Sequence, residues 1–542
     1  MRSLVLIVAF AAVAWAAPLW AQEEEEADPP QVAMGERLFL ETRFAQYFQA
    51  NSGGDVNAPL AAGDPVVATT RTLDGPMPGP FAGESMNCRA CHLVDDAKAT
   101  PGGGNRSYAD FGRESPIPVR DDGRTATPRN SPSLVNATLP RKRPLLLHFD
   151  GEFPSTPALV RGTLTGRNYG WLPSEAAAAV AHVARVVRED DGSGALARDF
   201  GGAYRVVLGG TDPSLPKELR LPKRFRIDVA RASDDAIVDG VARLVAAYVE
   251  SLTFAEDDGA FVGSAYDTFL AKNHIPVKPD EHEPDGFYRD RIREFLQLKD
   301  EFDFVGDEDG TLALHDHPFA FGPLELQGLR IFLSPRRGNC AACHVPPTFT
   351  DFALHNTGVS QVQYDAAHGP GAFAALAIPD AAVRAADPDA FLPATPVHPF
   401  AAEPFRSAID PARPGRVDLG VWNVFRNPDF PDRWHQRDLA RLVCASAPSR
   451  RACRRTPATQ VAAAVALFKT PGLRDLGHSD PYLHTGSSRT LEDVVRFYVE
   501  ASRLARAGVL RNGAVELRRM TIDESDVVPL AAFLRALDED YE

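Results

Sequence analysis

The feature that most constrains this 542-residue chain is a five-residue pattern, Cys-x-x-Cys-His, that occurs twice. The two copies consist of Cys88, Cys91 and His92, and of Cys340, Cys343 and His344. Two cysteines at this spacing can form thioethers with the two haem vinyl groups, and the adjacent histidine can bind the iron. A zinc site or a redox disulfide would not explain why histidine follows the second cysteine in both copies. The pattern therefore predicts two covalently bound haem c groups, with His92 and His344 as iron ligands.

Composition narrows the class of partner. Lys and Arg number 58 against 73 Asp and Glu, which gives a formal net charge of −15 and argues against a nucleic-acid partner. The 44% hydrophobic and 24% charged fractions are ordinary for packed domains, so disordered and coiled-coil classes are excluded. We expect a globular oxidoreductase rather than a nucleic-acid-binding protein.

The start of the chain predicts export. Residues 1–21 combine an arginine, a short apolar run and small residues near the end, as in a cleaved signal peptide, and residues 22–30 form an acidic, disordered tether. The apolar run is short for a bilayer span, so an uncleaved anchor is the less favoured alternative, and we expect no membrane span beyond it. The predicted location is the periplasm, whose oxidising conditions favour a disulfide between Cys444 and Cys453.

Helical periodicity surrounds both haem motifs and predicts a mainly α fold. The expected architecture is two cytochrome c-like haem domains that face each other, with long loops and few short strands. Residues 31–255 would form the N-terminal, peroxidatic domain, 256–320 the connection, and 321–542 the C-terminal, electron-transfer domain. Within them, 174–189 and 234–251 read as capped amphipathic helices.

The phrases around the motifs resemble the bacterial di-haem cytochrome c peroxidase and MauG family over nearly the whole mature chain. They are RNSPSLVNA at 129–137, HFDGE at 148–152, FTDFALHNTGV at 349–359 and FKTPGLRDLGHSDPYLHTGSSRTLEDVVRFY at 468–498. The resemblance implies that hydrogen peroxide reacts at the N-terminal haem and that the C-terminal haem relays electrons. It also implies a small redox partner, either a c-type cytochrome or a cupredoxin, or an oxidisable substrate.

The same resemblance implies further ligands. A calcium ion between the haems would take Asn130 and the carbonyls of Ser479 and Pro481, and oxygen ligands suit calcium. Tyr498 occupies the place where peroxidases of the family carry a methionine and MauG-like members a tyrosine. Met520 is the only methionine of the second domain and lies beyond that place, which disfavours a His/Met haem. The alternatives are a turn-stabilising Asn130 and a core-packing Tyr498.

The first haem departs from the family pattern. No histidine lies between His92 and His148, so no loop histidine is expected to cap this iron, although His148 itself is an alternative ligand. Phe149 stands where the family commonly has an electron-relay tryptophan, and the available tryptophans are Trp171, Trp422 and Trp434. The acid–base group that splits peroxide has no clean counterpart. The candidates are Glu175 and Arg167, with Tyr169 as a further pocket residue. Glu175 could equally serve as a first-turn helix charge.

The sequence therefore favours a periplasmic di-haem oxidoreductase that reduces hydrogen peroxide at the His92 haem with electrons passed through the His344 haem. A MauG-like oxidase is the closest variant. The alternatives are a di-haem oxygenase that resembles the rubber oxygenases and a pure electron-transfer cytochrome.

Overall fold

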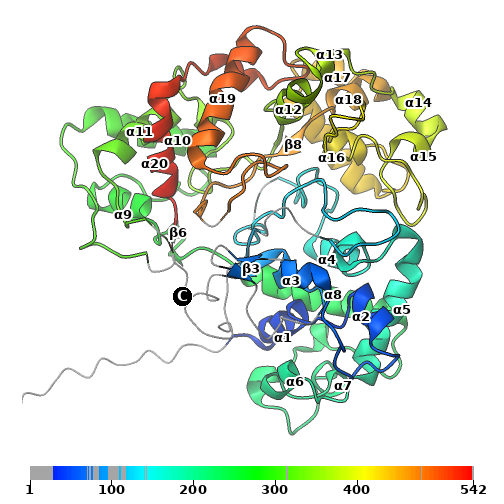
Figure 1. The fold of residues 1–542 in the computed structure, drawn as a ribbon. Helices are drawn as coiled ribbons and strands as arrows, with labels where there is room; N and C mark the ends of the chain where they lie inside the picture. Colours follow the sequence, from blue (N-terminus) through cyan, green and yellow to red (C-terminus); the bar gives the residue numbers. More distant parts are fainter. Residues whose placement is uncertain are drawn as a thin grey trace, which may run out of the picture.

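The computed structural model describes residues 28–69, 71–72, 75–76, 85–94, 109–111, 117–139, 141, 143–312, 315, 317–477 and 479–539. The predicted signal peptide and most of the acidic tether lie outside these residues. The chain is mainly helical, as predicted, and Figure 1 shows three groups of helices: an N-terminal group, a group around α11, α19 and α20, and a group around α12, α16 and α18. No helix within the described residues is long and apolar enough to cross a membrane.

The helices of the N-terminal group belong to the blue-to-green part of the chain. They are α1 (Pro30–Phe39), α2 (Gln46–Asn51), α3 (Pro65–Thr69), α4 (Thr156–Leu164), α5 (Ala176–Glu189), α6 (Ala195–Asp199), α7 (Tyr204–Val207) and α8 (Asp234–Ser251). The predicted helices 174–189 and 234–251 are confirmed as α5 and α8. Ser233 caps α8 and two aspartates occupy its first turn, which explains why the helix begins there.

The remaining helices build the second half. They are α9 (Ala265–Lys272), α10 (Asp285–Leu298), α11 (Pro323–Leu333), α12 (Val359–His368), α13 (Ala372–Ala375), α14 (Ala381–Ala386), α15 (Pro388–Phe391), α16 (Arg433–Ser446), α17 (Arg450–Cys453), α18 (Pro457–Ala463), α19 (Leu491–Arg506) and α20 (Val527–Arg535). The Cys444–Cys453 disulfide is confirmed and ties the end of α16 to α17. Because α9 and α10 pack into one core with α11 and α20, part of the predicted connection 256–320 belongs to the second half's core.

Among the described residues, the strands are two or three residues long and form four antiparallel pairs. They are β1 (Arg71–Thr72) with β2 (Gly75–Pro76), β3 (His92–Val94) with β4 (Ala109–Phe111), β5 (Glu256–Asp257) with β6 (Ala260–Phe261), and β7 (Leu354–His355) with β8 (Phe468–Lys469). Two of these pairs matter for the sites, because β3 begins at His92 and the β7–β8 pair sets His355 opposite Phe468.

The same helix pair recurs in both halves. In the first, α1 packs on α8, and a Cβ added at Gly35 would meet the Leu244 carbonyl oxygen at 2.2 Å. In the second, α11 packs on α20, and a Cβ at Gly328 would meet the Pro529 carbonyl oxygen at 2.0 Å. Only glycine permits backbones this close.

An aromatic contact accompanies each glycine, four residues further along its helix. The Phe39 and Tyr248 rings lie 5.1 Å apart at 61°, and the Phe332 and Phe533 rings lie 5.1 Å apart at 58°. A close glycine crossing with an aromatic pair beside it therefore occurs once in each half.

Ion pairs connect the two halves. Buried Arg129 reaches Asp150 at 2.7 Å and Asp418 at 2.5 Å, and Arg406 pairs with Glu152. Leu146 joins the hydrophobic core formed by α12, α16 and α18. The loop 117–152 is thus held against the second half by charge and by apolar packing.

Candidate haem sites

The second motif forms a tight turn at the end of α11. Cys340–Ala342 is a 3₁₀ turn, and the His344 backbone N–H donates to the Cys340 carbonyl at 2.9 Å. Asn339 enters this turn in the left-handed region, with φ 49°, and its side-chain amide donates to the Glu516 carbonyl at 2.9 Å. Asparagine tolerates this conformation better than most residues, so Asn339 fixes the approach to the motif.

His344 is oriented for metal binding. Its Nδ1 lies 2.9 Å from the Phe349 carbonyl oxygen, and only a protonated nitrogen can pair with a carbonyl. Nε2 is then left with its lone pair, which is the state an iron ligand needs. Burial lowers the pKa of His344, so the ring is neutral at pH 7.

One cavity joins the residues predicted to hold the second haem. Its lining includes Cys340, Cys343, His344, Tyr498 and Met520. Burial, followed by the nearby cysteines, raises the pKa of Tyr498 well above its usual range, and Thr357 bonds its hydroxyl. The mostly apolar lining, with two thiols, an imidazole and a phenol, fits a covalently attached haem with Tyr498 as second ligand. Met520 lines the same cavity, although its place in the sequence disfavours it.

The first motif is held from α1 and from the segment before α5. Cys88–Ala90 is again a 3₁₀ turn, and Asn87 caps it by accepting from the Ala90 N–H at 3.1 Å while donating to the Leu40 carbonyl at 3.1 Å. The Tyr169 hydroxyl lies 3.1 Å from the Cys88 sulfur. These contacts place the turn against the first core.

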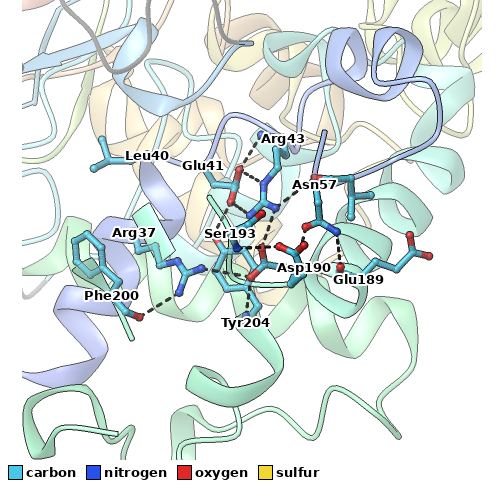
Figure 2. Close-up of polar contacts among 12 residues, drawn as sticks. Arg37, Leu40, Glu41, Arg43, Asn57, Glu189, Asp190, Ser193, Phe200 and Tyr204 are labelled. Carbon is cyan, nitrogen blue, oxygen red and sulfur yellow. Dashed lines mark hydrogen bonds and ion pairs between the residues drawn. The ribbon is translucent and has the colours of Figure 1, made fainter. Parts of the chain in front are cut away.

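Figure 2 shows the buried ion-pair network that fixes the chain just beyond Leu40. Arg43 holds Glu41 at 2.7 Å and Asp190 at 2.9 Å, and the Tyr204 hydroxyl donates to Glu41 at 2.7 Å. Burial opposes the charge on Glu41, but Arg43 and Tyr204 lower its pKa to about 2. Since Leu40 in turn binds Asn87, this network supports the first haem turn.

His92 is neutral and close to His148. Burial, followed by the neighbouring His148, lowers the pKa of His92 to about 4, while the Pro132 carbonyl acts in the opposite direction. His148 Nδ1 lies 3.1 Å from a Glu152 carboxylate oxygen, so a hydrogen bond holds this histidine. The next residue, Phe149, lines the second haem cavity and lies 6.3 Å from the His484 ring. Phe149 thus lines the second cavity and follows a residue that acts on His92, and its role in electron relay stays a prediction.

The predicted acid–base residues are engaged by other side chains. Arg120 grips both carboxylate oxygens of Glu175 at 2.7 and 2.9 Å, and Arg167 binds Asp122 at 2.7 and 2.8 Å. Glu175 also accepts the Leu172 N–H at 2.9 Å, as a turn-capping residue does. A catalytic role for Glu175 and Arg167 stays a prediction. Residues 95–108 and 112–116, which follow the first motif, lie outside the described residues.

The candidate relay tryptophans lie in three different parts of the molecule. Trp171 and Trp422 are fully buried in two different cores, and Trp434 is exposed on α16. Each position agrees with packing or surface roles as well as with electron transfer.

The predicted calcium ligands come together in part. The Asn130 amide contacts the Pro481 carbonyl, and the Asn130 Oδ1 atom is buried with no hydrogen-bond partner among the described residues. Turning the Asn130 amide by 180° would place Oδ1 beside the Pro481 oxygen, where a cation could bind both. Ser479 is buried two residues before Pro481. An orphaned buried oxygen beside a carbonyl fits a hard cation.

Sequence reasoning missed the residues that hold the motif turns. Asn87 and Asn339 each precede the first cysteine of a motif, so the repeated pattern is one residue longer than Cys-x-x-Cys-His. This repeated asparagine is the sequence feature that could have identified both residues. Tyr169 was considered only as a pocket residue, and nothing in the sequence pairs it with Cys88.

Together, the two sites define a protein built to carry two haems. No family model matches the chain. A 71-residue segment, 13% of this chain and 20% of its relative, is 37% identical to the methylamine utilization protein MauG of Methylophilus methylotrophus. A 70-residue segment is 34% identical to the cytochrome-c peroxidase IdrP1 of Denitromonas iodatirespirans and covers 13% of this chain and 17% of that one. The matches thus span about a fifth of the length of these curated relatives.

Two solved structures that are similar over most of the chain share 18% and 14% identity with it. The di-haem peroxidase BthA from Burkholderia thailandensis aligns with 95% of this chain and 87% of its own, at 18% identity and a TM-score of 0.44. A MauG-like protein associated with microbial copper homeostasis aligns with 97% and 96%, at 14% identity and a TM-score of 0.41. Through these curated matches, short segments of the chain are similar to MauG and to a cytochrome-c peroxidase.

Proposed function

We propose that this protein is a periplasmic di-haem c-type oxidoreductase of the peroxidase type. Hydrogen peroxide would be reduced at the haem attached to Cys88 and Cys91, and electrons would arrive through the haem attached to Cys340 and Cys343. The curated relatives named as MauG and as a cytochrome-c peroxidase support this class. The observation that carries the proposal is the cavity lined by both cysteines of the second motif, His344 and Tyr498.

The chain's own residues would prepare each haem for a different task. Haem c supplies one-electron and peroxide chemistry when bound, and the protein tunes it through the axial ligands and their hydrogen bonds. The Phe349 carbonyl keeps His344 in one tautomer, and an anionic Tyr498 ligand would favour the higher oxidation states of the second haem. Asn130, Ser479 and Pro481 would hold calcium between the two halves.

Tyr498 also favours the MauG-like variant of this function over a peroxidase with a His/Met haem. In that variant the oxidising equivalents from peroxide would be stored and passed to an oxidisable substrate rather than discharged by a reduced redox protein. An oxygenase is favoured by no described contact, and a pure electron-transfer cytochrome requires a second ligand at both irons.

The test compares Tyr498→Phe with Met520→Leu in haem-loaded protein. Because both side chains line the cavity, Met520 is the matched control. We expect Tyr498→Phe to change the optical and electron paramagnetic resonance spectra of one haem, and Met520→Leu to leave them unchanged. The reverse result would assign the second haem to Met520 and contradict the proposal's ligand set.

A peroxide titration then separates the variants of the function. Rapid turnover with reduced cytochrome c indicates a peroxidase, and a long-lived spectral change after one equivalent of peroxide indicates the MauG type. No reaction with peroxide, with oxygen uptake on an organic substrate, would replace the proposal with the oxygenase. A resting spectrum without high-spin haem would favour the electron-transfer cytochrome.

A further inference from the structure

A cluster of two histidines and two aspartates lies outside both haem sites. It brings together the segment before α11 (His315 and His317), the loop after β8 (Asp475) and the residue that follows α20 by three positions (Asp538). The His315 and Asp538 side chains are 1% and 0% exposed, and that of His317 is 17% exposed. Buried polar side chains at this density need partners of matching charge.

The inner atoms of the cluster converge. His317 Nε2 lies 3.0 Å and His315 Nδ1 lies 3.9 Å from the same oxygen, Asp538 Oδ2. The donor atoms of these three residues all lie within 4.8 Å of one another. Two imidazoles and one carboxylate at this separation are the ligand set that zinc and similar divalent ions bind.

The other ring nitrogen of each histidine and the other oxygen of Asp538 are the outer atoms of the cluster. Each of them has a further polar partner. His315 Nε2 lies 3.2 Å from Asp475 Oδ1, His317 Nδ1 lies 3.3 Å from the Pro318 carbonyl, and Asp538 Oδ1 accepts the Leu476 N–H at 2.7 Å. A carboxylate and a carbonyl can each take a proton from the outer ring nitrogen, which leaves the inner nitrogens as lone-pair donors. Metal-binding histidines are held in this way.

Gly477 lies against the cluster, at a position where a larger side chain would take up the space beside the metal-binding atoms. A Cβ added at Gly477 would meet Asp538 Oδ2 and His315 Nδ1 at 2.6 Å each. Both of these are inner atoms of the cluster. Gly477 therefore keeps space open beside them.

From this geometry we propose a zinc-type divalent metal site formed by His315, His317 and Asp538, with Asp475 orienting His315. The ion would join the start of the α11 segment to the end of the α20 segment, so its role is structural. The site is independent of the haem ligands. It also adjoins the predicted calcium segment, because the Asp475 carbonyl accepts the Ser479 hydroxyl at 2.9 Å.

The test uses full-length, haem-loaded protein stripped with EDTA and kept in excess calcium, which occupies hard oxygen sites. Equilibrium dialysis against ZnCl₂ with elemental analysis measures bound zinc. We expect one zinc per chain in the native protein and at least about a tenfold loss of affinity in His317→Gln and in Gly477→Ala. His398→Gln is the matched control, since His398 pairs with Asp429 at 2.8 Å elsewhere, and it should bind zinc like the native protein.

Two results would overturn the site: native protein that takes up no zinc, or His317→Gln and Gly477→Ala variants that bind it as tightly as the native protein. If a variant fails to fold, as judged by its haem spectrum, zinc X-ray absorption of the native protein decides. Two imidazole ligands with Zn–N near about 2.0 Å support the proposal, and an all-oxygen shell contradicts it.

Discussion

The two haem-binding halves use the same helix crossing but surround their motifs differently. Gly35 on α1 and Gly328 on α11 allow the same close approach to the closing helix of each half, and both motifs form 3₁₀ turns after an asparagine. In the second half, His344 shares a cavity with Tyr498 from the distant helix α19. Near His92, the groups that act on its pKa are His148 and the Pro132 carbonyl.

This difference teaches that the motif fixes only one side of a haem site. The five-residue pattern would supply the thioethers and one histidine ligand, and both are local in sequence. The other axial position depends on which remote element the fold brings over the motif. Two halves with the same attachment chemistry can therefore take different roles.

The largest expected effect tests whether each motif attaches its own haem. The Cys88→Ser/Cys91→Ser and Cys340→Ser/Cys343→Ser double variants should each lose one of two haems, because the thioethers cannot form. A pyridine haemochrome assay measures the haem content per chain. The Cys444→Ser/Cys453→Ser variant removes the disulfide instead and should keep both haems. A motif variant that retains two haems would break the equivalence of the halves.

The next effect tests whether the two helix crossings are equivalent. Gly35→Ala and Gly328→Ala should each destabilise the protein by about 3 kcal/mol, because a methyl group would collide with a backbone carbonyl of the partner helix. Gly194→Ala is the control, since a Cβ there meets no atom within 4 Å, and it should stay within about 0.5 kcal/mol. Thermal unfolding followed by circular dichroism measures all three. A tolerated Gly35→Ala would show that only the second crossing is close-packed.

A third prediction concerns pH. A histidine in each half should change the stability of the protein with pH, and the two changes have opposite signs. Burial opposes the charge on His315, but Asp475 and Asp538 raise its pKa to about 9. In metal-free protein this stabilisation is complete below pH 6.5 and is lost as the pH rises toward 9, by about 2 kcal/mol between pH 7 and 9. His182 in the first half behaves oppositely, because burial lowers its pKa, and its contribution is lost as the pH falls below 6.5.

Melting temperatures between pH 5 and 9, measured in EDTA, check this assignment. His315→Gln should flatten the alkaline limb of the profile, and His182→Gln should flatten the acidic limb. Part of the alkaline limb should remain in His315→Gln, because burial raises the pKa of Glu539 to about 8. An alkaline limb of unchanged slope in His315→Gln would contradict the charge assigned to this histidine.

The smallest effect distinguishes the two asparagines. Asn87→Ala should cost about 1 kcal/mol through the lost cap, and Asn339→Ala a similar amount through the left-handed backbone. Glycine should restore more of the lost stability at 339, where φ is 49°, than at 87, where φ is −140° and the hydrogen bond to the Leu40 carbonyl is also lost. Equal behaviour of the two glycine variants in thermal unfolding would show that the turns are held alike.

Sequence patterns predicted the parts of the molecule that depend on local residues. The helices at 174–189 and 234–251 and the disulfide follow from spacing, capping and short-range chemistry. The contact of Tyr169 with Cys88 and the zinc-type cluster could not be predicted, because they join residues that only tertiary packing brings together. Glu175 shows the same limit, since its pairing with Arg120 depends on a loop whose path the sequence does not specify.

Arg129 carries a consequence for how the molecule can come apart. Its guanidinium is shared between Asp150 and Asp418, so one buried cation fastens a loop of the first half to the second. A proteolytic cut at the exposed residues 280–282 would break the backbone but leave these ion pairs intact. The two fragments should then migrate as one non-covalent complex, in which the neighbouring Asn130 still contacts Pro481.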